Sequence, residues 1–476
     1  MLHQLSCKGV ELMGHSMVVY SWAQQEFGQA ALGDERRTRR LVRLAAGLAS
    51  QVGVAISSAC GRCGAQTVSR LLGRKEVTLD HVTRAHIERT GDRCKVCERV
   101  LAVQDTTVLD FSTHEGTEGL GPITTSRRSR GLLMHTTLAV SADKTPLGLL
   151  GVQVWARDDQ KRGCAKARRS RPISDKESQK WLDGLDQAQS ATAADQPVLV
   201  IGDRESDVFA LFAAPRRENV GLLVRVAHNR ALLGGEFGYV REALENAPVL
   251  GSYTVDVLRQ GSRPKRTANM EVRVTRALLK PPVNRTVDIP ETPVSVSLIR
   301  AVETNAPDGV QRLDWTLLTT DVVEDLAHAR EMIRCYTARW VIEEFHRVMK
   351  SGCRVEQLQL DTVERLLPAI GLFAVVAWRV LHLTKLARSD PEMTALEVAN
   401  PEEVDVLSHW LRSNGDKSWN INTAREFNIA VARLGGFLGR KSDGMPGTKT
   451  TWQGLRSLEI LVQGYRLATS ARFNKR

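Results

Sequence analysis

Residues with the types and spacing needed for chemistry at a phosphate gather near Glu343. Tyr336, Arg339, Glu343 and Lys350 lie at offsets of three, seven and fourteen, so all four side chains share one face of a helix. No Gly or Pro occurs from 326 to 350, which predicts one long helix. An aromatic ring, two cations and a carboxylate are not the composition of a core-facing stripe. The spacing alone also fits a solvent-exposed face with salt-bridge periodicity.

Two apolar runs upstream each end in an aspartate, Asp105 and Asp203. Such β-branched runs predict buried strands, and strand ends are where open α/β sheets carry ligands and chemistry. Together with Glu343, these aspartates offer hard oxygen ligands that suit Mg²⁺, or Mn²⁺ as its substitute, rather than zinc. Two ions about 3.5–4 Å apart would clamp the attacking and leaving oxygens of a displacement at phosphate. The alternative is two turn-capping aspartates and an unrelated glutamate.

The three carboxylates in this order, with Tyr336-(2)-Arg339-(3)-Glu343-(6)-Lys350 around the last, resemble the insertion-sequence-four family of bacterial DDE transposases. Within that family the resemblance is to the Tn-five type, and it covers roughly residues 20–445. Further motifs recur in order: Ala31-Leu-Gly-Asp-Glu-Arg-Arg-Thr38, Asp175-Lys-Glu-Ser-Gln-Lys-Trp181, Gly202-Asp-Arg-Glu-Ser-Asp207, Leu313-Asp-Trp315 and Ala430-Val-Ala-Arg-Leu-Gly-Gly436.

The resemblance implies a cut-and-paste DNA transposase with two ions in each active site. Asp105 is expected to bridge both ions, with Asp203 and Glu343 completing one site each. One ion activates water to free a 3′-OH and the other stabilises the leaving oxygen. In similar enzymes the 3′-OH then forms a hairpin, which is opened before strand transfer. The implied partners are double-stranded DNA, as terminal inverted repeats and as target, and a second copy of the chain in a DNA-bound homodimer.

Further residues are expected at the DNA end by resemblance. Tyr336, Arg339 and Lys350 would hold phosphates around a flipped base, on which Trp315 would stack. Such stacking is worth roughly 1–3 kcal/mol per base. Trp340 matches a second aromatic near the same end. For either tryptophan, the alternative is an ordinary core residue.

One expected DNA contact departs from the family pattern. Arg225 matches an arginine that contacts the DNA end, but Ala227 stands where the family has a lysine. That contact is therefore missing or is supplied by His228 or Arg230.

The expected elements are antiparallel strands followed by β-α-β alternation, which is the order of a ribonuclease-H-like core. The resemblance implies the same fold, which would bring the carboxylates together. The expected strands are Val100–Gln104, Leu132–Val140, Gly148–Trp155, Val198–Ile201 and Gly221–Val226. A basic loop at 161–171 precedes a helix beginning near Ser174, and a short helix is expected at Val208–Ala213. From about 230 to 316 the pattern predicts a β-rich insertion without helices, with strands at Tyr253–Val257, Met270–Val274, Val294–Ile299 and Leu313–Leu318.

The predicted fold class is multidomain α/β, with this core and insertion inside residues 99–385. Residues 1–98 are expected to form a helical DNA-binding domain, and 386–476 a helical dimerisation domain. An amphipathic helix in the first domain has Leu41, Leu44 and Leu48 on its apolar face. Its cationic face, suited to phosphates and guanine edges, carries Arg36, Arg37, Arg39, Arg40 and Arg43. Residues 1–16 precede the family-like sequence and are a candidate over-called start, with Met13 and Met17 as alternative start positions.

Composition narrows the class further. A net charge of +12 and a pI near 9.5 indicate an anionic partner, although a basic enzyme without one remains an alternative. The apolar run Leu366–Trp378 is too short to cross a bilayer, and no secretion signal is recognisable. We expect a cytoplasmic bacterial protein that acts at the nucleoid. Eight cysteines favour free thiols, with a zinc site at Cys60, Cys63, Cys94 and Cys97 as the lesser alternative.

Two other functions compete with the transposase reading. A DNA-binding regulator would occupy end sequences without cutting, and the intact carboxylate triad argues against it. A housekeeping metal nuclease would nick DNA without strand transfer, and the base-flipping residues Trp315 and Tyr336 argue against that.

Overall fold

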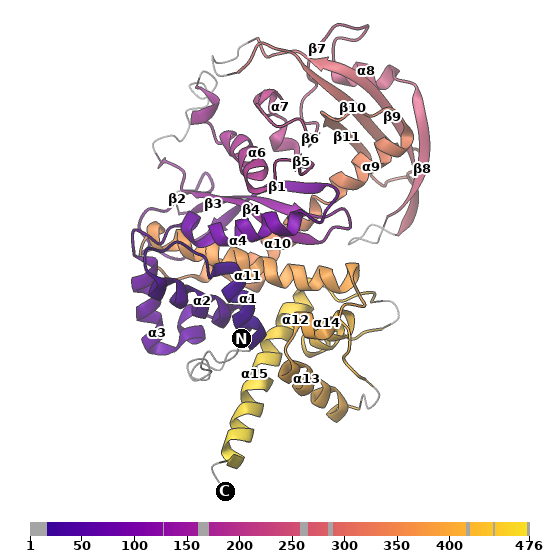
Figure 1. Cartoon of the computed structure of the whole chain (residues 1–476). Coiled ribbons are helices and arrows are strands. Elements are labelled where there is room, and N and C mark those ends of the chain that lie inside the picture. The colour runs from indigo at the N-terminus through magenta and orange to yellow at the C-terminus, as the bar shows by residue number, and fades with distance from the viewer. Residues whose placement is uncertain are drawn as a thin grey trace.

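The computed structural model describes residues 17–126, 128–159, 171–257, 265–283, 289–415, 419–440 and 443–473. Helices form the two ends of the chain and a large mixed sheet lies between them (Figure 1). The predicted fold class is confirmed: an α/β core carries a β-rich insertion and helical regions at both ends.

From residue 17 on, the N-terminal region consists of the helices α1 (Met17–Phe27), α2 (Glu35–Ser50), α3 (Ile56–Leu72) and α4 (Leu79–Cys94). Helix α2 begins where the Asp34 side chain accepts a hydrogen bond from the Arg36 N–H at 2.8 Å. Its predicted apolar face is buried, as Leu41, Leu44 and Leu48 are at most 2% exposed. These helices share one hydrophobic core with the sheet and with α11 (Val363–Ser389).

The central sheet has the strand order and directions of a ribonuclease-H-like core. Strands β4 (Pro146–Trp155), β3 (Arg130–Val140) and β1 (Val100–Asp110) pair antiparallel. Strands β1, β5 (Val198–Gly202) and β6 (Val220–Arg225) then pair parallel. The short strand β2 (Gly121–Pro122) adds to β3. The helices α6 (Gln179–Ala191) and α7 (Phe209–Ala213) follow β4 and β5, so the helix expected from Ser174 begins five residues later, after a 3₁₀ turn at Ile173–Asp175.

The insertion extends this sheet instead of forming a separate one. Its strands are β7 (Leu232–Leu233), β8 (Val249–Val257), β9 (Arg266–Leu279), β10 (Val294–Glu303) and β11 (Asp314–Thr319). Strand β11 pairs with β6, which joins the insertion to the core. The expectation of an insertion without helices is wrong, because α8 (Val240–Asn246) lies within it. That helix forms because Val240, Ala243 and Leu244 fall on one side and are buried against the sheet.

The segment predicted as one long helix is interrupted. Helix α9 (Leu326–Thr337) ends before α10 (Trp340–Arg347), and α10 runs into a π-helical turn at Val348–Gly352. At the break, the N–H groups of Ala338 and Arg339 bond to carbonyls three residues back. The sequence has no Gly or Pro there, so no breaker signals this local tightening.

Helix α11 crosses beneath the sheet and carries the apolar run Leu366–Trp378 (Figure 1). Its length and composition would allow it to span a bilayer, but 83% of its apolar window is buried inside the protein. The apolar run therefore belongs to a buried helix, which packs against α10. A 3₁₀ turn at Val355–Gln357 precedes it.

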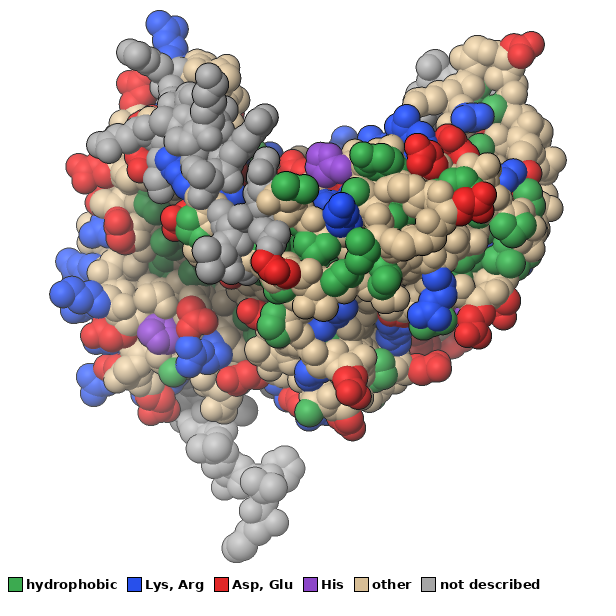
Figure 2. All heavy atoms as spheres, turned by 90° about the horizontal axis from the view of Figure 1, so that it is seen from above, with side chains coloured by type: hydrophobic (Ala, Val, Ile, Leu, Met, Phe, Trp, Pro, Cys, Tyr) green, Lys and Arg blue, Asp and Glu red, His purple; other side chains and the backbone are tan. Residues whose placement is uncertain are grey.

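The C-terminal region is helical, as predicted. It contains α12 (Ala395–Val398), α13 (Pro401–Ser413), α14 (Ala424–Leu434) and α15 (Thr448–Phe473). Helices α13 and α14 both begin with a capping box, with Asn400 and Thr423 at their N-caps. Helix α15 projects away from the body of the protein (Figure 1). Seen from above, the outline of the molecule is concave along one margin, and charged side chains of both signs are scattered over the visible face (Figure 2).

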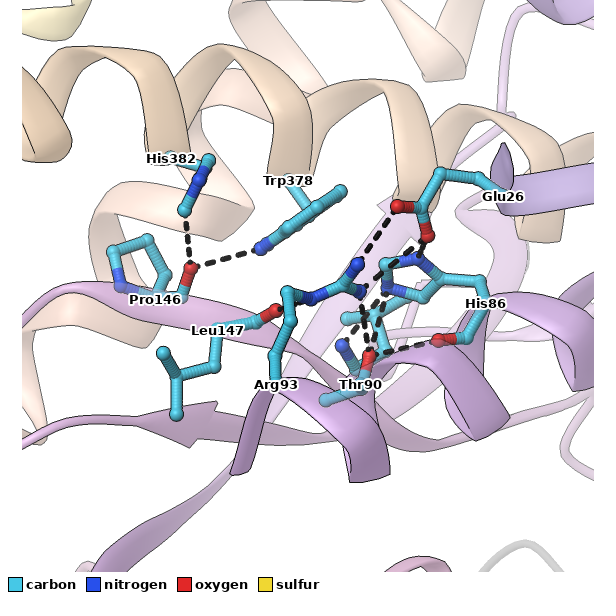
Figure 3. Close-up of polar contacts among 9 residues, drawn as sticks. Glu26, His86, Thr90, Arg93, Pro146, Leu147, Trp378 and His382 are labelled. Carbon is cyan, nitrogen blue, oxygen red and sulfur yellow. Dashed lines mark hydrogen bonds and ion pairs between the residues drawn. The ribbon is translucent and has the colours of Figure 1, made fainter. Parts of the chain in front are cut away.

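A buried polar network fixes the N-terminal helices to the core (Figure 3). Glu26 of α1 accepts from Arg93 Nη1 of α4 at 2.8 Å and contacts His86 Nδ1 at 2.5 Å. His86 Nε2 accepts the Leu149 N–H of β4 at 3.0 Å, which assigns the remaining ring proton to Nδ1. The Arg93 guanidinium also lies 4.5 Å from the ring centroid of Trp378 on α11.

Candidate active site

Strand alternation decides which way the predicted catalytic carboxylates face. On β1, Leu101, Val103 and Leu109 belong to the hydrophobic cluster that contains α10 and α11. The intervening Val100 and Ala102 belong to the cluster that contains α6 and α7. Because side chains alternate along a strand, Asp105 faces the same side as the odd-numbered leucines and valine. It therefore faces the helix that carries Glu343.

The register aligns three polar residues across neighbouring strands. Val103 of β1 pairs with Ile201 of β5, and the same register continued sets Asp105 beside Asp203. Gly202 pairs with Val224, so the next rung sets Asp203 beside Arg225 of β6. The prediction that Asp105 ends its strand is wrong. Strand β1 continues to Asp110 because its Thr-Thr-Val-Leu segment still pairs with β3, while β5 stops at Gly202.

Glu343 on α10 is held by an arginine one turn earlier. Arg339 Nη2 donates to Glu343 Oε1 at 2.6 Å, and the two side chains are 15% and 45% exposed. Nothing in the described part of the chain places three His, Cys, Asp or Glu side chains as a ready-made metal cluster. The carboxylates are neighbours, but Glu343 is engaged elsewhere.

The pKa values of Asp105 and Asp203 are both raised. Burial, together with the charges of Asp203 and Glu343, raises the pKa of Asp105 to about 6. The Thr106 N–H at 2.9 Å and the Arg339 charge oppose that rise. Burial likewise raises the pKa of Asp203. Crowded, half-buried carboxylates with raised pKa values fit a divalent cation, because its charge would favour their ionised forms.

An aromatic cluster lies beside the carboxylates. The Trp315 ring lies 6.0 Å, centroid to centroid, from Tyr336 and 6.0 Å from Trp340, in edge-to-face geometry. Tyr336 is buried, Trp315 is half-buried and Trp340 is 50% exposed. Trp315 also lines a pocket of about 610 Å³, together with Arg204, Arg225, His228, Arg241, Arg300 and Arg312. Arginines and a half-buried aromatic ring in one pocket suit the phosphate and the base of a nucleotide.

Lys350 and His346, which follow Glu343, both approach strand β1. Lys350 Nζ donates to the Val108 carbonyl at 2.8 Å and lies 3.1 Å from Glu356 Oε1. His346 Nδ1 lies 3.8 Å from Asp105 Oδ2, and burial lowers the pKa of this histidine to about 3. The imidazole is therefore neutral and contributes no charge beside Asp105.

Three family models match the chain. "Transposase DNA-binding" matches residues 20–67, "Transposase DDE domain" matches 171–377 and "Transposase Tn5 dimerisation domain" matches 375–473. The three models follow one another along the chain. The chain is a DDE transposase of the Tn5 type. Enzymes of this class cleave DNA and transfer its strands.

A solved structure adds a distant similarity. A piggyBac transposase synaptic complex with hairpin DNA, determined by cryo-EM, is similar over 67% of this chain and 54% of that chain. The sequence identity is 11% and the TM-score 0.32, which is too low for the likeness to carry an argument. This transposase thus spans about half the length of that relative.

The predicted DNA-binding arginines of the transposase differ in their surroundings. Arg36, Arg39, Arg40 and Arg43 are exposed along α2. Arg37 instead lies 3.0 Å from Glu76 and donates to the Leu32 carbonyl at 2.9 Å, so it stabilises the loop that precedes α2.

Sequence reasoning quoted Asp207 within a motif but gave it no role. Its buried carboxylate accepts the N–H groups of Ala227 and His228, at 2.8 and 3.0 Å, and pairs with Arg230. Asp207 thereby shapes the segment after Arg225. Of the two substitutes expected for the family's lysine, Arg230 is engaged and only His228 is exposed. A polar residue after a short helix gives no sequence signal for such a role.

The structure describes only some of the cysteines and loop residues named in the sequence predictions. Cys94 is buried and Cys97 is half-buried, and both are free thiols. The side chains of Cys60 and Cys63 lie outside the described residues, as does most of the basic loop 161–171. The zinc alternative stays a prediction, and so do the domain boundaries, of which the one at 385/386 falls inside α11.

Proposed function

We propose that the transposase acts by cut-and-paste transposition. Asp105, Asp203 and Glu343 would be its catalytic residues and would hold two Mg²⁺ ions, for which Mn²⁺ substitutes. When bound, the ions would act as Lewis acids on the attacking water and on the leaving 3′ oxygen. The observation that carries this proposal is the convergence of the two strand carboxylates and the α10 glutamate on one face of the sheet, beside the Trp315 cluster.

The reaction would begin with hydrolysis at the transposon end. Water attacks the phosphorus, the P–O3′ bond breaks and a 3′-OH is freed. That hydroxyl would then attack the opposite strand and leave a hairpin, which a second water opens before strand transfer into target DNA. Trp315 and Trp340 would receive the base that a hairpin requires to be extruded.

The remaining predicted contacts have defined tasks in this proposal. Arg225, beside Asp203, and Tyr336, Arg339 and Lys350 would position phosphates of the end. Arg36 and Arg40 of α2 would bind the inverted repeat, whereas Arg37 stays engaged with Glu76. Synapsis would pair two copies of the chain. We expect the enzyme to act on bacterial nucleoid DNA in the cytoplasm.

A cleavage assay tests the proposal. Purified protein is incubated with Mg²⁺ and duplexes carrying the inverted repeats that flank its gene, and products are resolved on a denaturing gel. Nicked and hairpin products with wild type, and binding alone with Glu343→Gln, are expected. Binding without cutting by both proteins, in Mg²⁺ and in Mn²⁺, would instead favour the non-cutting DNA-binding regulator.

A further inference from the structure

The guanidinium of Arg339 is only partly satisfied where it stands. One nitrogen, Nη2, bonds Glu343 at 2.6 Å. Its Nε is buried and has no hydrogen-bond partner among the residues that the structure describes. A buried donor without a partner is costly, so this arrangement leaves an arginine ready to exchange partners.

The same guanidinium supplies positive charge to the whole carboxylate group. Its field opposes the raised pKa values of both Asp105 and Asp203, and it pairs directly with Glu343. Arg339 therefore compensates the three residues that a metal would otherwise compensate. This agrees with the lack of a ready-made cluster among the described residues.

The backbone around Arg339 is irregular on both sides of Glu343. Helix α10 begins after the tightened turn at Ala338 and Arg339, and it ends in the π-helical turn at Val348–Gly352. Such 3₁₀ and π segments inside a helix often mark functional hinges. The eight-residue helix that carries Glu343 is thus bounded by two irregular turns.

We propose that Arg339 is a DNA-released lock on the metal site, a positioning residue that occupies Glu343 until a phosphate of the transposon end takes over the guanidinium. The proposal rests on the proposed function, because it assumes that DNA reaches this helix. A phosphate offers two charged oxygens for a bidentate contact, whereas Glu343 accepts a single bond. Once released, Glu343 completes the oxygen ligand set with Asp105 and Asp203. Metal binding then depends on the transposon end. DNA without that end would not be cleaved, because the metal site would stay incomplete.

Coupling between two ligands is reciprocal, so metal and DNA end must strengthen each other's binding equally. The test measures Mn²⁺ affinity of the full chain by electron paramagnetic resonance of free Mn²⁺. It compares wild type with Arg339→Gln and Arg339→Lys, each alone and with an inverted-repeat duplex cut at the transposon end. A dideoxy 3′ end on that duplex prevents any strand reaction. Arg347→Gln, an exposed arginine on the same helix, is the matched control for loss of one charge.

Wild type alone is expected to bind Mn²⁺ weakly, and its Mn²⁺ affinity is expected to rise about tenfold when the duplex is present. Arg339→Gln is expected to bind about tenfold more tightly without DNA and to gain little from it, with Arg339→Lys in between. Equal DNA-free affinities for wild type, Arg339→Gln and Arg339→Lys overturn the lock, as does an equal gain in Arg347→Gln. A gain in Arg339→Gln with no effect of duplex on wild type overturns the release by DNA. Failure of the wild type to bind the duplex would instead count against the proposed function. The DNA-free Mn²⁺ affinities would still test the lock, because they are measured without duplex.

Discussion

Glu26 Oε2 lies 2.5 Å from His86 Nδ1, so a carboxylate–imidazole pair joins α1 to α4 inside the protein. Burial alone would raise the pKa of Glu26, but His86 and Arg93 outweigh it and lower that pKa to about 2. Burial also lowers the pKa of His86, which keeps the ring neutral. This network fixes the DNA-binding helices to the sheet that carries the active site.

Acid should therefore lower the free energy of unfolding of the transposase in two stages. An unfolded His86 takes up a proton near pH 6.5 that the folded one refuses, so stability begins to fall below that pH. The Glu26 contribution is present above about pH 4.5 and is lost as pH falls toward 2. Urea unfolding between pH 3 and 8 measures both. Glu26→Gln should cost about 3 kcal/mol at pH 7.5 and weaken the fall in stability at low pH, because it removes the buried carboxylate that pairs with Arg93 and His86.

The control for that experiment is Asp80→Asn, which breaks an exposed pair with Arg84 on the same helix α4. It should change stability little at any pH, since exposed pairs contribute little. The same pH dependence in wild type and Glu26→Gln would refute the assignment of the acid limb to this network.

Asp105→Asn should exchange activity for stability. Because the folded pKa of Asp105 is raised to about 6, ionising it in the metal-free protein costs stability as pH rises from about 4 to 6 and at every higher pH. In EDTA at pH 7.5 the variant should be more stable by about 1–3 kcal/mol, and near pH 4 the gain should vanish. Strand cleavage in Mg²⁺ should be abolished. Thermal unfolding at both pH values is the measurement, and a gain that is independent of pH would contradict the explanation.

Trp315→Ala should weaken capture of the extruded base by about 1–3 kcal/mol, or roughly 5- to 150-fold. With 2-aminopurine near the transposon end, its fluorescence reports whether the base leaves the stack, and a gel reports the hairpin. Nicking should persist while hairpins decline, and Trp315→Phe should retain part of the yield. Hairpin formation at the wild-type level in Trp315→Ala would remove this tryptophan from the role.

Two neighbouring arginines on α2 should separate DNA binding from stability. Arg40 is exposed, so Arg40→Ala should lower affinity for the inverted repeat and reduce the salt dependence of binding by about one phosphate contact. Arg37→Ala should mainly lower the unfolding temperature, because Arg37 bonds Glu76 and the Leu32 carbonyl. Affinity titrations at several salt concentrations and thermal unfolding distinguish the two. The reverse pattern would show that Arg37, not Arg40, contacts DNA.

Helix α15 should supply a pairing surface for two subunits. Ile460 and Leu467 on it are 62% and 72% exposed, within the stretch that matches the Tn5 dimerisation domain. Leu467→Asp should leave binding of one DNA end intact and abolish complexes that contain two. Native gels with two labelled ends of different length measure this. The matched control is Leu438→Asp, at a leucine that is 66% exposed and lies outside that helix.

The sequence predicted the core strands because long β-branched runs bear their own signal, and Asp203 was correctly expected after β5. It could not place Asp105 within a strand, because that depends on β5 stopping while β3 continues to pair. The engagement of Arg37 and Arg230 was also invisible, since their partners Glu76 and Asp207 are distant in sequence. The roles assigned to the candidate site residues stay predictions, because only geometry supports them.

The continuity of the sheet from β5 through β6 to β11 has a metric consequence. Two strand spacings separate β5, which Asp203 directly follows, from β11, which carries Trp315, and this is on the order of 10 Å. That span equals the rise of about three stacked nucleotides along one strand. Because hydrogen-bonded strands keep a nearly constant spacing, the sheet holds the distance between β5 and β11 fixed. It would fix how many nucleotides separate the cut from the extruded base, whatever the sequence of the transposon end.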